Sequence, residues 1–481
     1  MLEGLEVSEV KFSELQITNY ELRLDAEYFS KKNIELNRQL DKVGFQYIND
    51  FAFVTDGIHT SIDYCEDSNV KLVSATSPRE NYFDFSRNVF ISEKAHSENP
   101  RTALKIDDII VSTVGTIGNC AVVKESDLPA NSDRHVGIIR LNDRQFLSNY
   151  ISTFLLSKYG RFQTLRESTG NVQLNLFIYK IKALKIANLS IDFQNKIEET
   201  VKLAHSKREQ SQTLYRQAEE LLLENIFNHK EHKGITKNTK ELCEPCEKNF
   251  VPFVVKENYN IKSFKESFLE TGRLDAEYYQ PKYEELIKHI ETFETERLNA
   301  IVSIKKSIEP GSDAYETDGI PFIRVSNLSK FGLTDTDIYL DKSKFGNLDL
   351  QPKKDTILLS KDGSVGIAYK IEQDLDVITS GALLHLTVTN KDFLPDYVTL
   401  ILNSEVVKMQ AERDAGGSII QHWKPSEIEQ VIIPKIPLST QHQISALIQE
   451  SFALRKESER LLAEAKGMVE REVEKEKIII K

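Results

Sequence analysis

Hydrophobic positions follow two different spacings along the chain, and each spacing predicts a different kind of element. Short apolar and β-branched runs broken by Gly, Asn, Asp and Ser, such as Asp108–Val111 and Asp355–Leu359, predict strands joined by turns. Apolar residues three and four positions apart over 147–165 and 397–413 predict helices. Because strand-like and helical segments alternate, we expect a mixed α+β fold.

Two longer segments carry an imperfect heptad pattern, which is typical of helices that pair. The apolar or small positions are Ile197, Val201, Ala204, Ser211, Tyr215, Ala218 and Leu222 in the first segment, and Ile444, Ile448, Ser451, Leu462, Ala465 and Val469 in the second. Charged residues flank both stripes, so we expect the two helices to pack together as an antiparallel coiled coil. The 30 residues from 197 to 226 would then form a rod about 45 Å long, at about 1.5 Å per residue. The heptads alone favour an ordinary dimerising coiled coil, and only the duplicated domains described next argue against it.

The chain also repeats itself at a spacing of about 250 residues. Residues 23–29, Arg-Leu-Asp-Ala-Glu-Tyr-Phe, return as residues 273–279 with six of seven positions identical. Three further blocks return in the same order: 108–118 as 355–366, Arg166, Gly170 and Gln173 as Arg413, Gly417 and Gln421, and 181–197 as 428–444. Four blocks in one order indicate two copies of one domain, each followed by a helix.

These patterns divide the chain into five parts. We expect a first globular domain over 1–190, a first long helix over 191–228, a linker over 229–262, a second globular domain over 263–437 and a second long helix over 438–481. The linker is rich in Lys, Glu, Asn and His and has few apolar residues before Phe250, as a solvated connector would. Duplicated domains with paired helices predict a pseudo-two-fold arrangement.

Composition limits the possible classes of protein. The 481 residues are 40% hydrophobic and 28% charged, which is typical of a globular chain with more than one domain. Met1 to Ser13 is acidic and lacks the apolar stretch of a signal peptide. Four cysteines do not make a disulfide framework, so we expect a cytoplasmic protein. The net charge of −12 argues against a nonspecific DNA coat but allows local basic clefts.

The layout resembles the specificity (S) subunit of type I restriction–modification enzymes. The resemblance is carried by the twin Arg-Leu-Asp-Ala-Glu-Tyr blocks, by residues 323–328 (Ile-Arg-Val-Ser-Asn-Leu), by 361–366 (Lys-Asp-Gly-Ser-Val-Gly) and by 433–441, a Pro-rich lead-in that ends in Gln. The first half departs from this pattern at 73–78 and 187–190. Such divergence is expected if each domain reads a different half-site.

The resemblance implies two target-recognition domains, each followed by a long helix, in a non-catalytic subunit of a bacterial phage-defence complex. Such a subunit binds double-stranded DNA at a bipartite target and holds DNA adenine methyltransferase subunits, two in this family, with restriction (motor-endonuclease) subunits added for cleavage. S-adenosylmethionine, ATP and magnesium would then be bound by the partners and none by this chain. An enzyme with its own active site is disfavoured, because the chain lacks the Asn/Asp-Pro-Pro-aromatic motif of amino-methyltransferases and a phosphate-binding loop. A coiled-coil scaffold without base readout stays the alternative.

Candidate DNA contacts lie in loops of both copies. Arg can pair with guanine edges and Asn or Gln with adenine edges, and Gly-rich turns let the backbone approach phosphates. The candidates are Arg324, Asn327, Lys361, Ser364, Gln421 and Trp423 in the second copy, and Thr113, Thr116, Asn171 and Gln173 in the first. Structural alternatives stay open: Asn327 could cap its own turn, the Gly-rich loops could be plain hairpin turns, and Trp423 could lie in the core.

Two further motifs suggest chemistry that we do not expect. The carboxylates of Asp25 and Glu27, and of their repeats, would lie near the start of a helix, where acidic residues favour the helix dipole, so we interpret them as structural. Cys243 and Cys246 have the spacing of half a zinc site, with His229 and His232 nearby. No second Cys pair follows, so we expect no metal.

Overall fold

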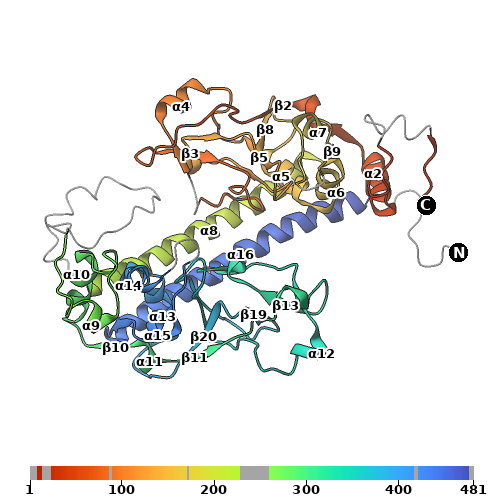
Figure 1. Cartoon of the computed structure of the whole chain (residues 1–481). Coiled ribbons are helices and arrows are strands. Elements are labelled where there is room, and N and C mark those ends of the chain that lie inside the picture. The colour runs from red at the N-terminus through yellow and green to blue at the C-terminus, as the bar shows by residue number, and fades with distance from the viewer. Residues whose placement is uncertain are drawn as a thin grey trace. The chain divides into compact units, whose positions relative to one another are not determined.

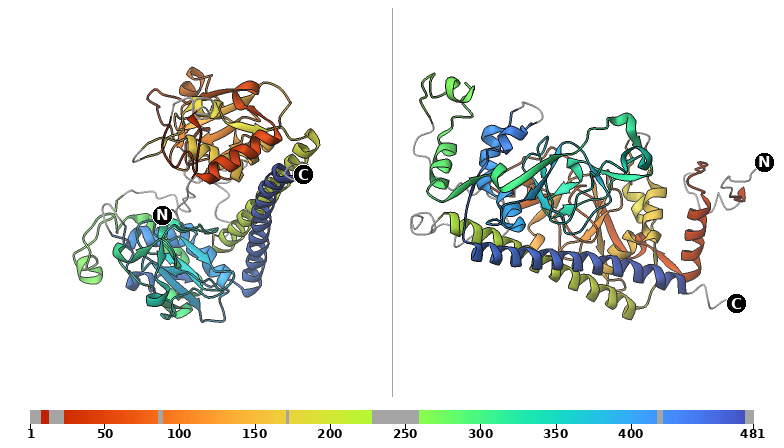
Figure 2. Two further views of the ribbon diagram at one scale, coloured as in Figure 1. Left: turned by 90° about the vertical axis from the view of Figure 1, so that its right-hand side faces the viewer. Right: turned by 90° about the horizontal axis from the view of Figure 1, so that it is seen from below.

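The computed structural model describes residues 8–12, 23–85, 89–170, 173–227, 259–416 and 421–475 (Figures 1 and 2). The chain divides into two compact units, 1–209 with 454–481, and 210–453. The division passes through both long helices, so each unit contains one repeat together with parts of both helices. This differs from the predicted division, in which each helix was a segment of its own.

The first unit is built on a four-stranded antiparallel sheet. Its strand order is β2 (Ala52–Asp56), β8 (Val136–Leu141), β5 (Ile109–Ser112) and β6 (Cys120–Val122). A smaller sheet has the order β4 (Val89–Ile91), β3 (Val70–Val73) and β7 (Ala130–Ser132), and β1 (Phe45–Tyr47) pairs with β9 (Lys185–Ala187). The helices are α2 (Lys31–Val43), α3 (Ile48–Phe51), α4 (Glu93–Glu98), α5 (Ser148–Leu156), α6 (Lys158–Glu167) and α7 (Ile178–Lys182).

The second unit repeats this plan. Its main sheet has the order β11 (Val302–Lys306), β20 (Leu383–Val388), β17 (Ile357–Ser360) and β18 (Ala368–Lys370). The smaller sheet is β12 (Tyr315–Glu316), β16 (Tyr339–Leu340), β13 (Ile320–Ile323) and β19 (Ile378–Thr379), and two pairs are added, β10 (Thr295–Arg297) with β21 (Ile432–Pro434) and β14 (Leu328–Ser329) with β15 (Gly332–Leu333). The helices are α9 (Phe268–Thr271), α10 (Pro281–Ile290), α11 (Leu298–Ile301), α12 (Lys342–Phe345), α13 (Pro395–Leu402), α14 (Glu405–Asp414) and α15 (Pro425–Ile428). The shared strand order confirms the predicted α+β fold and its duplication.

The long helices are α8 (Ile191–Ile226) and α16 (Leu438–Lys475). Every predicted heptad position is buried. In the first unit, Ile197 and Val201 of α8 share a core with Ala465 and Val469 of α16. In the second unit, the order is reversed, because the late residues Ala218 and Leu222 of α8 share a core with Ile444 and Ile448 of α16. The helices therefore run antiparallel, as predicted, and each stripe also packs into a domain core. The two-fold relation between the domains stays a prediction.

One glutamine at the start of each long helix makes the same contacts in both copies. Gln194, in the first turn of α8, accepts a hydrogen bond from Leu147 N at 3.0 Å and donates to Leu189 O at 3.0 Å. Gln441, in the first turn of α16, accepts from Leu394 N at 2.9 Å and donates to Ile436 O at 3.0 Å. A buried Gln amide with both ends satisfied fixes the start of each long helix to its own domain.

A second pair of glutamines ties a helix to an edge strand in each copy. Gln163 of α6 donates to Lys185 O at 3.0 Å and accepts from Lys185 N at 2.8 Å. Gln410 of α14 makes the same two bonds to Ile432, at 3.0 and 2.9 Å. The repeated residues therefore mark the joints that hold this fold together.

Candidate nucleic-acid interface

In the second domain, the turn after β17 meets the loop that follows α14. Lys361 O accepts a hydrogen bond from Trp423 N at 2.8 Å, and Gly363 N donates to Gln421 O at 2.9 Å. His422 forms an antiparallel bridge with Asp362, and its Nδ1 lies 2.9 Å from Asp362 Oδ1. Backbone bonds thus hold two loops, distant in sequence, against each other.

The first domain contains the same junction. Thr113 O accepts from Leu176 N at 2.9 Å, and Asn175 forms an antiparallel bridge with Val114. Asn175 therefore corresponds to His422, and Leu176 to Trp423. Asn175 was not among the predicted contacts, although its spacing of 247 residues from His422 is the spacing of the neighbouring repeat blocks.

This register corrects the predicted pairing of Gln173 with Gln421. Gln421 immediately precedes His422, so its counterpart is Leu174, and Gln173 lies one position earlier. Backbone hydrogen bonds decide the register, whereas a single shared Gln in a loop cannot place a one-residue shift. Both glutamines are nonetheless exposed, as are Thr116 and Ser364. Asn171, also predicted, lies outside the described residues.

Two predicted contacts are wrong because their side chains are buried. Trp423 is 1% exposed and belongs to the hydrophobic core of its domain. Its counterpart Leu176 is equally buried. In an extended segment, side chains alternate in direction, so a residue next to the outward His422 faces inward. Thr113 is also buried, at 6% exposure, and cannot contact DNA in this conformation.

Asn327 closes its own turn after β13. Its Oδ1 accepts from Arg324 N at 3.1 Å, and its Nδ2 donates to Asp335 O at 2.9 Å. In the first domain, Ser77 Oγ accepts from Ser74 N at 3.0 Å, which is the same turn with different residues. The structural alternative for Asn327 is therefore the one observed, because both ends of its amide are used.

Arg324 and Lys361 supply the positive charge near these loops. Arg324 is half-buried, and its Nε has no hydrogen-bond partner among the residues that the structure describes. Lys361 forms an ion pair with Asp362, the carboxylate that also holds His422. Asp362 thus positions one cation and one ring at the surface of the turn.

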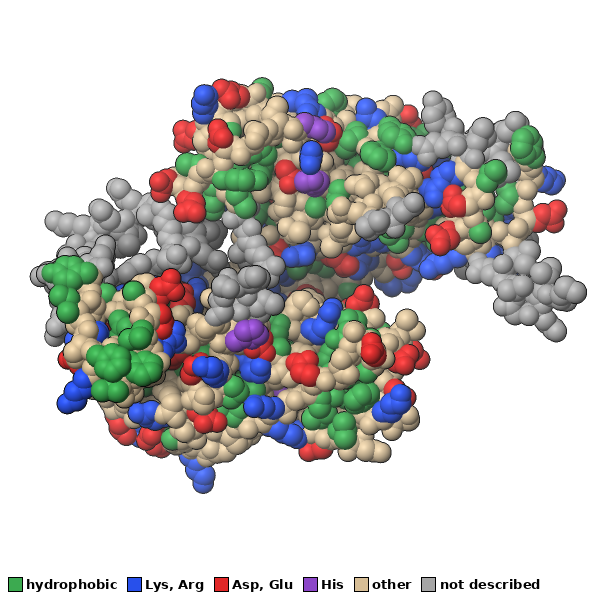
Figure 3. Space-filling view, in the orientation of Figure 1, with side chains coloured by type: hydrophobic (Ala, Val, Ile, Leu, Met, Phe, Trp, Pro, Cys, Tyr) green, Lys and Arg blue, Asp and Glu red, His purple; other side chains and the backbone are tan. Residues whose placement is uncertain are grey.

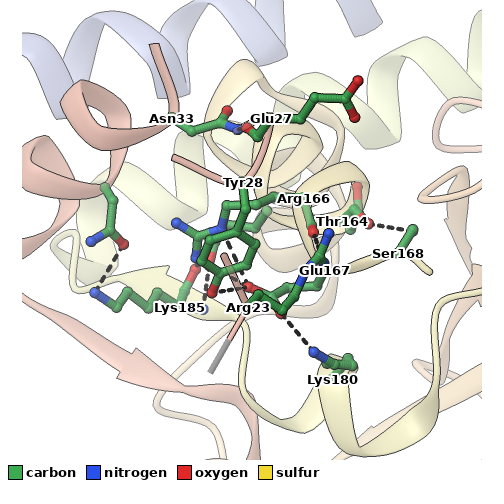
Figure 4. A network of polar contacts seen from close by, with 12 residues as sticks. Arg23, Glu27, Tyr28, Asn33, Thr164, Arg166, Glu167, Ser168, Lys180 and Lys185 are labelled. Carbon is green, nitrogen blue, oxygen red and sulfur yellow. Dashed lines mark hydrogen bonds and ion pairs between the residues drawn. The ribbon is translucent and has the colours of Figure 1, made fainter. Parts of the chain in front are cut away.

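The Arg-Leu-Asp-Ala-Glu-Tyr blocks form a clamp in each domain. Figure 4 shows part of the first, with Arg23 close to Tyr28 and Arg166. Arg23 forms an ion pair with Asp25 at 2.8 Å and lies over the Tyr28 ring at 4.8 Å. Its Nη1 also donates to Arg166 O, at the end of α6, at 2.7 Å. The bond from Arg23 lowers the pKa of Asp25, and burial raises the pKa of Tyr28 to about 12.

The second clamp has the same geometry. Arg273 pairs with Asp275 at 2.6 Å, lies over Tyr278 at 4.5 Å and donates to Asp414 O at 3.0 Å. These contacts are structural, as interpreted, but the expected helical position is wrong. Residues 26–29 form a turn, and α2 begins only at Lys31, because Ser30 caps it.

Among the described residues, no three His, Cys, Asp or Glu side chains are grouped so that they could hold a metal ion. Cys243, Cys246, His229 and His232 lie outside the described part of the chain. In that same described part, none of the helices has the length and apolar character needed to cross a membrane.

The chain was compared with known proteins. Residues 290–463 match the model of the type I restriction modification DNA specificity domain. No curated protein matches the sequence. The type I restriction-modification S subunit from M. genitalium is a similar solved structure, at 12% identity and a TM-score of 0.36, with 89% of this chain and 92% of that chain covered.

Two other solved structures are similar. The HsdS subunit from Thermoanaerobacter tengcongensis has 12% identity and a TM-score of 0.28, with 89% of this chain and 95% of that chain covered. A chain from a study of complex assembly and conformational transition of the type I R-M system has 13% identity and a TM-score of 0.28, with 90% and 97% covered. Residues 290–463, most of the second domain with the first part of α16, therefore form a type I restriction modification DNA specificity domain.

Proposed function

We propose that this chain is the non-catalytic DNA-reading subunit of a type I restriction–modification complex, with one half of a bipartite target read by each domain. The observation that supports this most directly is the loop junction, which recurs with the same backbone bonds but with different exposed or half-exposed side chains. The first domain presents Thr116, Gln173 and Asn175, and the second presents Ser364, Gln421 and His422. A constant frame with different side chains suits two readers of two different half-sites.

The chemistry of these side chains fits base readout. Gln and Asn amides can bond an adenine edge with two hydrogen bonds, and Ser and Thr hydroxyls bond several bases. The bond from Nδ1 of His422 to Asp362 leaves Nε2 directed away from that carboxylate, and the side chain is 62% exposed. Arg324 and Lys361 would contact phosphates, which sets orientation rather than sequence.

The partners follow from the same proposal. The chain would hold DNA adenine methyltransferase subunits, two per complex, and restriction subunits where cleavage occurs. S-adenosylmethionine, ATP and magnesium would be bound by those partners. The length of the paired helices would set the spacing of the two half-sites, because half-site spacing follows protein geometry.

Long-read methylation profiling of a host that expresses this chain with its methyltransferase tests the proposal. A modified bipartite motif should disappear when the gene for this chain is deleted. Gln173→Ala and Gln421→Ala remove one exposed amide from the reading loop of each domain, and each should relax one half of the motif while the other half stays unchanged. A motif that survives deletion of this chain contradicts the proposal and favours a scaffold.

A further inference from the structure

Several residues that are identical in the two copies make the same internal contacts in each. Arg23, Asp25 and Tyr28 make the same internal contacts as Arg273, Asp275 and Tyr278, and the paired glutamines do likewise. A second set of identical residues is the shared face, which we define as Leu24, Ala26 and Glu27 in the first domain and Leu274, Ala276 and Glu277 in the second. These residues are identical in both copies but exposed.

The two leucines of the shared face are apolar but largely exposed. Leu24 is 77% and Leu274 is 66% exposed. No described residue bonds the carboxylate of Glu27 or Glu277. Figure 4 shows the Glu27 side chain extending away from the Arg23–Tyr28–Arg166 network. The clamp thus fixes the backbone of the turn and directs Leu and Glu outward, so folding does not explain why they are the same twice.

In the second domain, the shared face borders a hollow. The hollow has a volume of about 790 Å³, and Leu274, Ala276 and Glu277 line it together with Lys282. Further exposed apolar side chains lie in the preceding segment, namely Ile261, Phe264, Phe268 and Leu269. Figure 3 shows hydrophobic side chains gathered on this domain in the region of α9 and α10. An apolar surface of this kind marks a contact with another protein.

DNA is a poor occupant for this face, because Glu27 and Glu277 would be repelled by the phosphates. The reading loops also differ between the domains, as they must if the half-sites differ. A face with the same residues in both domains is expected to bind the same kind of surface at each domain. A partner present in two copies would explain why the face occurs twice. An apolar pocket on that partner would accept the leucine, and Lys or Arg at the edge of the pocket would pair with the glutamate.

We propose that the shared face docks the two methyltransferase subunits, one on each domain. The identity of the occupant rests on the proposed function, whereas the position of the surface rests on the internal repeat. Each subunit would insert apolar side chains around Leu24 or Leu274 and would pair a basic group with Glu27 or Glu277.

Native mass spectrometry of the full chain, co-expressed with its methyltransferase, tests this inference. The unchanged chain should bind two methyltransferase subunits. Leu24→Asp and Leu274→Asp should each bind one, and the double variant should bind none, with each site weakened at least tenfold. Leu348→Asp is the control, because Leu348 is also exposed but lies outside the repeated blocks. Circular dichroism of every variant should match that of the unchanged chain.

The outcomes separate the two proposals. If the double variant still binds two methyltransferases, the docking surface is overturned while the proposed function stands. If the unchanged chain binds no methyltransferase, both are overturned. A dimer of this chain that the double variant abolishes would give the face to a second copy and would also overturn the inference.

Discussion

The two domains share a frame but join it to the long helices with different chemistry. In the first domain, Nε2 of His205 in α8 lies 2.6 Å from Asn81 O. At the corresponding positions of the second domain, Phe452 of α16 packs against Phe331, with ring centroids 6.5 Å apart. The same contact between loop and helix is therefore polar in one domain and aromatic in the other. The residues at this joint can differ between the domains when both contact partners differ together.

A second difference lies beneath the helices. In the second domain, buried Lys370 pairs with Asp396 at 2.7 Å, and Gln449 of α16 donates to Asp396 at 3.0 Å. The corresponding residues of the first domain are Val122 and Asn149. Burial lowers the pKa of Lys370, but the bond to Asp396 outweighs it, so the pKa lies above its ordinary value. The second domain thus depends on a buried charge pair that the first domain lacks.

Breaking that pair should have the largest effect. We expect Asp396→Ala to lower the free energy of unfolding of the second domain by about 3–5 kcal/mol, because the buried charge of Lys370 then keeps only the exposed carboxylates of Glu372 and Asp355 as partners. Trp423 is the one tryptophan of the chain and lies in the core of this domain, so its fluorescence in a urea titration reports the loss. Asn149→Ala, the matched change in the first domain, should leave the fluorescence midpoint in place. An equal shift from both variants would contradict the comparison.

Acid should destabilise the second domain, because it protonates a second buried group there, the side chain of His385. Burial lowers the pKa of His385 to about 4 from its ordinary value of 6.5, and the corresponding residue of the first domain is Ile138. The folded domain therefore binds this proton less readily than the unfolded chain. The resulting stability is complete above pH 6.5 and is lost as the pH falls towards 4, by about 3 kcal/mol in all.

The measurement for His385 is the free energy of unfolding by Trp423 fluorescence between pH 7 and pH 5. His385→Leu removes the titrating group, so the dependence on pH should become shallower by about 2 kcal/mol over this range. If the two slopes are equal, His385 does not titrate as its burial implies.

Exchanging the residues at the two joints between loop and helix should lower the free energy of unfolding by a smaller amount. Phe452→His places a polar ring among aromatic side chains, and His205→Phe removes the bond to Asn81 O, so each should lower stability by about 1–3 kcal/mol. Only Phe452→His should move the unfolding transition seen by Trp423, because that joint belongs to the second domain. A shift of the same size from His205→Phe would show that the two domains unfold as one unit.

The exposed reading positions should have the smallest effect on stability. Gln421→Ala and Gln173→Ala should each change the free energy of unfolding by no more than about 0.5 kcal/mol, since their side chains are exposed. Each should nevertheless weaken discrimination at one base by about 1–3 kcal/mol, measured by competition with altered half-sites. Loss of stability without loss of discrimination would place these residues in the frame rather than in the reading surface.

The sequence by itself predicted the duplication, the α+β class, the heptad positions and the antiparallel order of the long helices. Repetition and periodicity can be detected in the sequence itself. They are retained because both domains fill their cores with residues of the same kind at the same spacing. The starts of α8 and α16, at Ile191 and Leu438, also agree with the predicted positions.

Only the tertiary structure decided which loop residues face outward. Trp423 and His422 are neighbours in one loop, yet the first fills the core and the second is exposed, because a bond from Trp423 N to Lys361 O sets the register. Backbone bonds of the same kind also show that the counterpart of Gln421 is Leu174, whereas the sequence had predicted Gln173. Contacts between segments far apart in the sequence fix such directions, and no local pattern contains them.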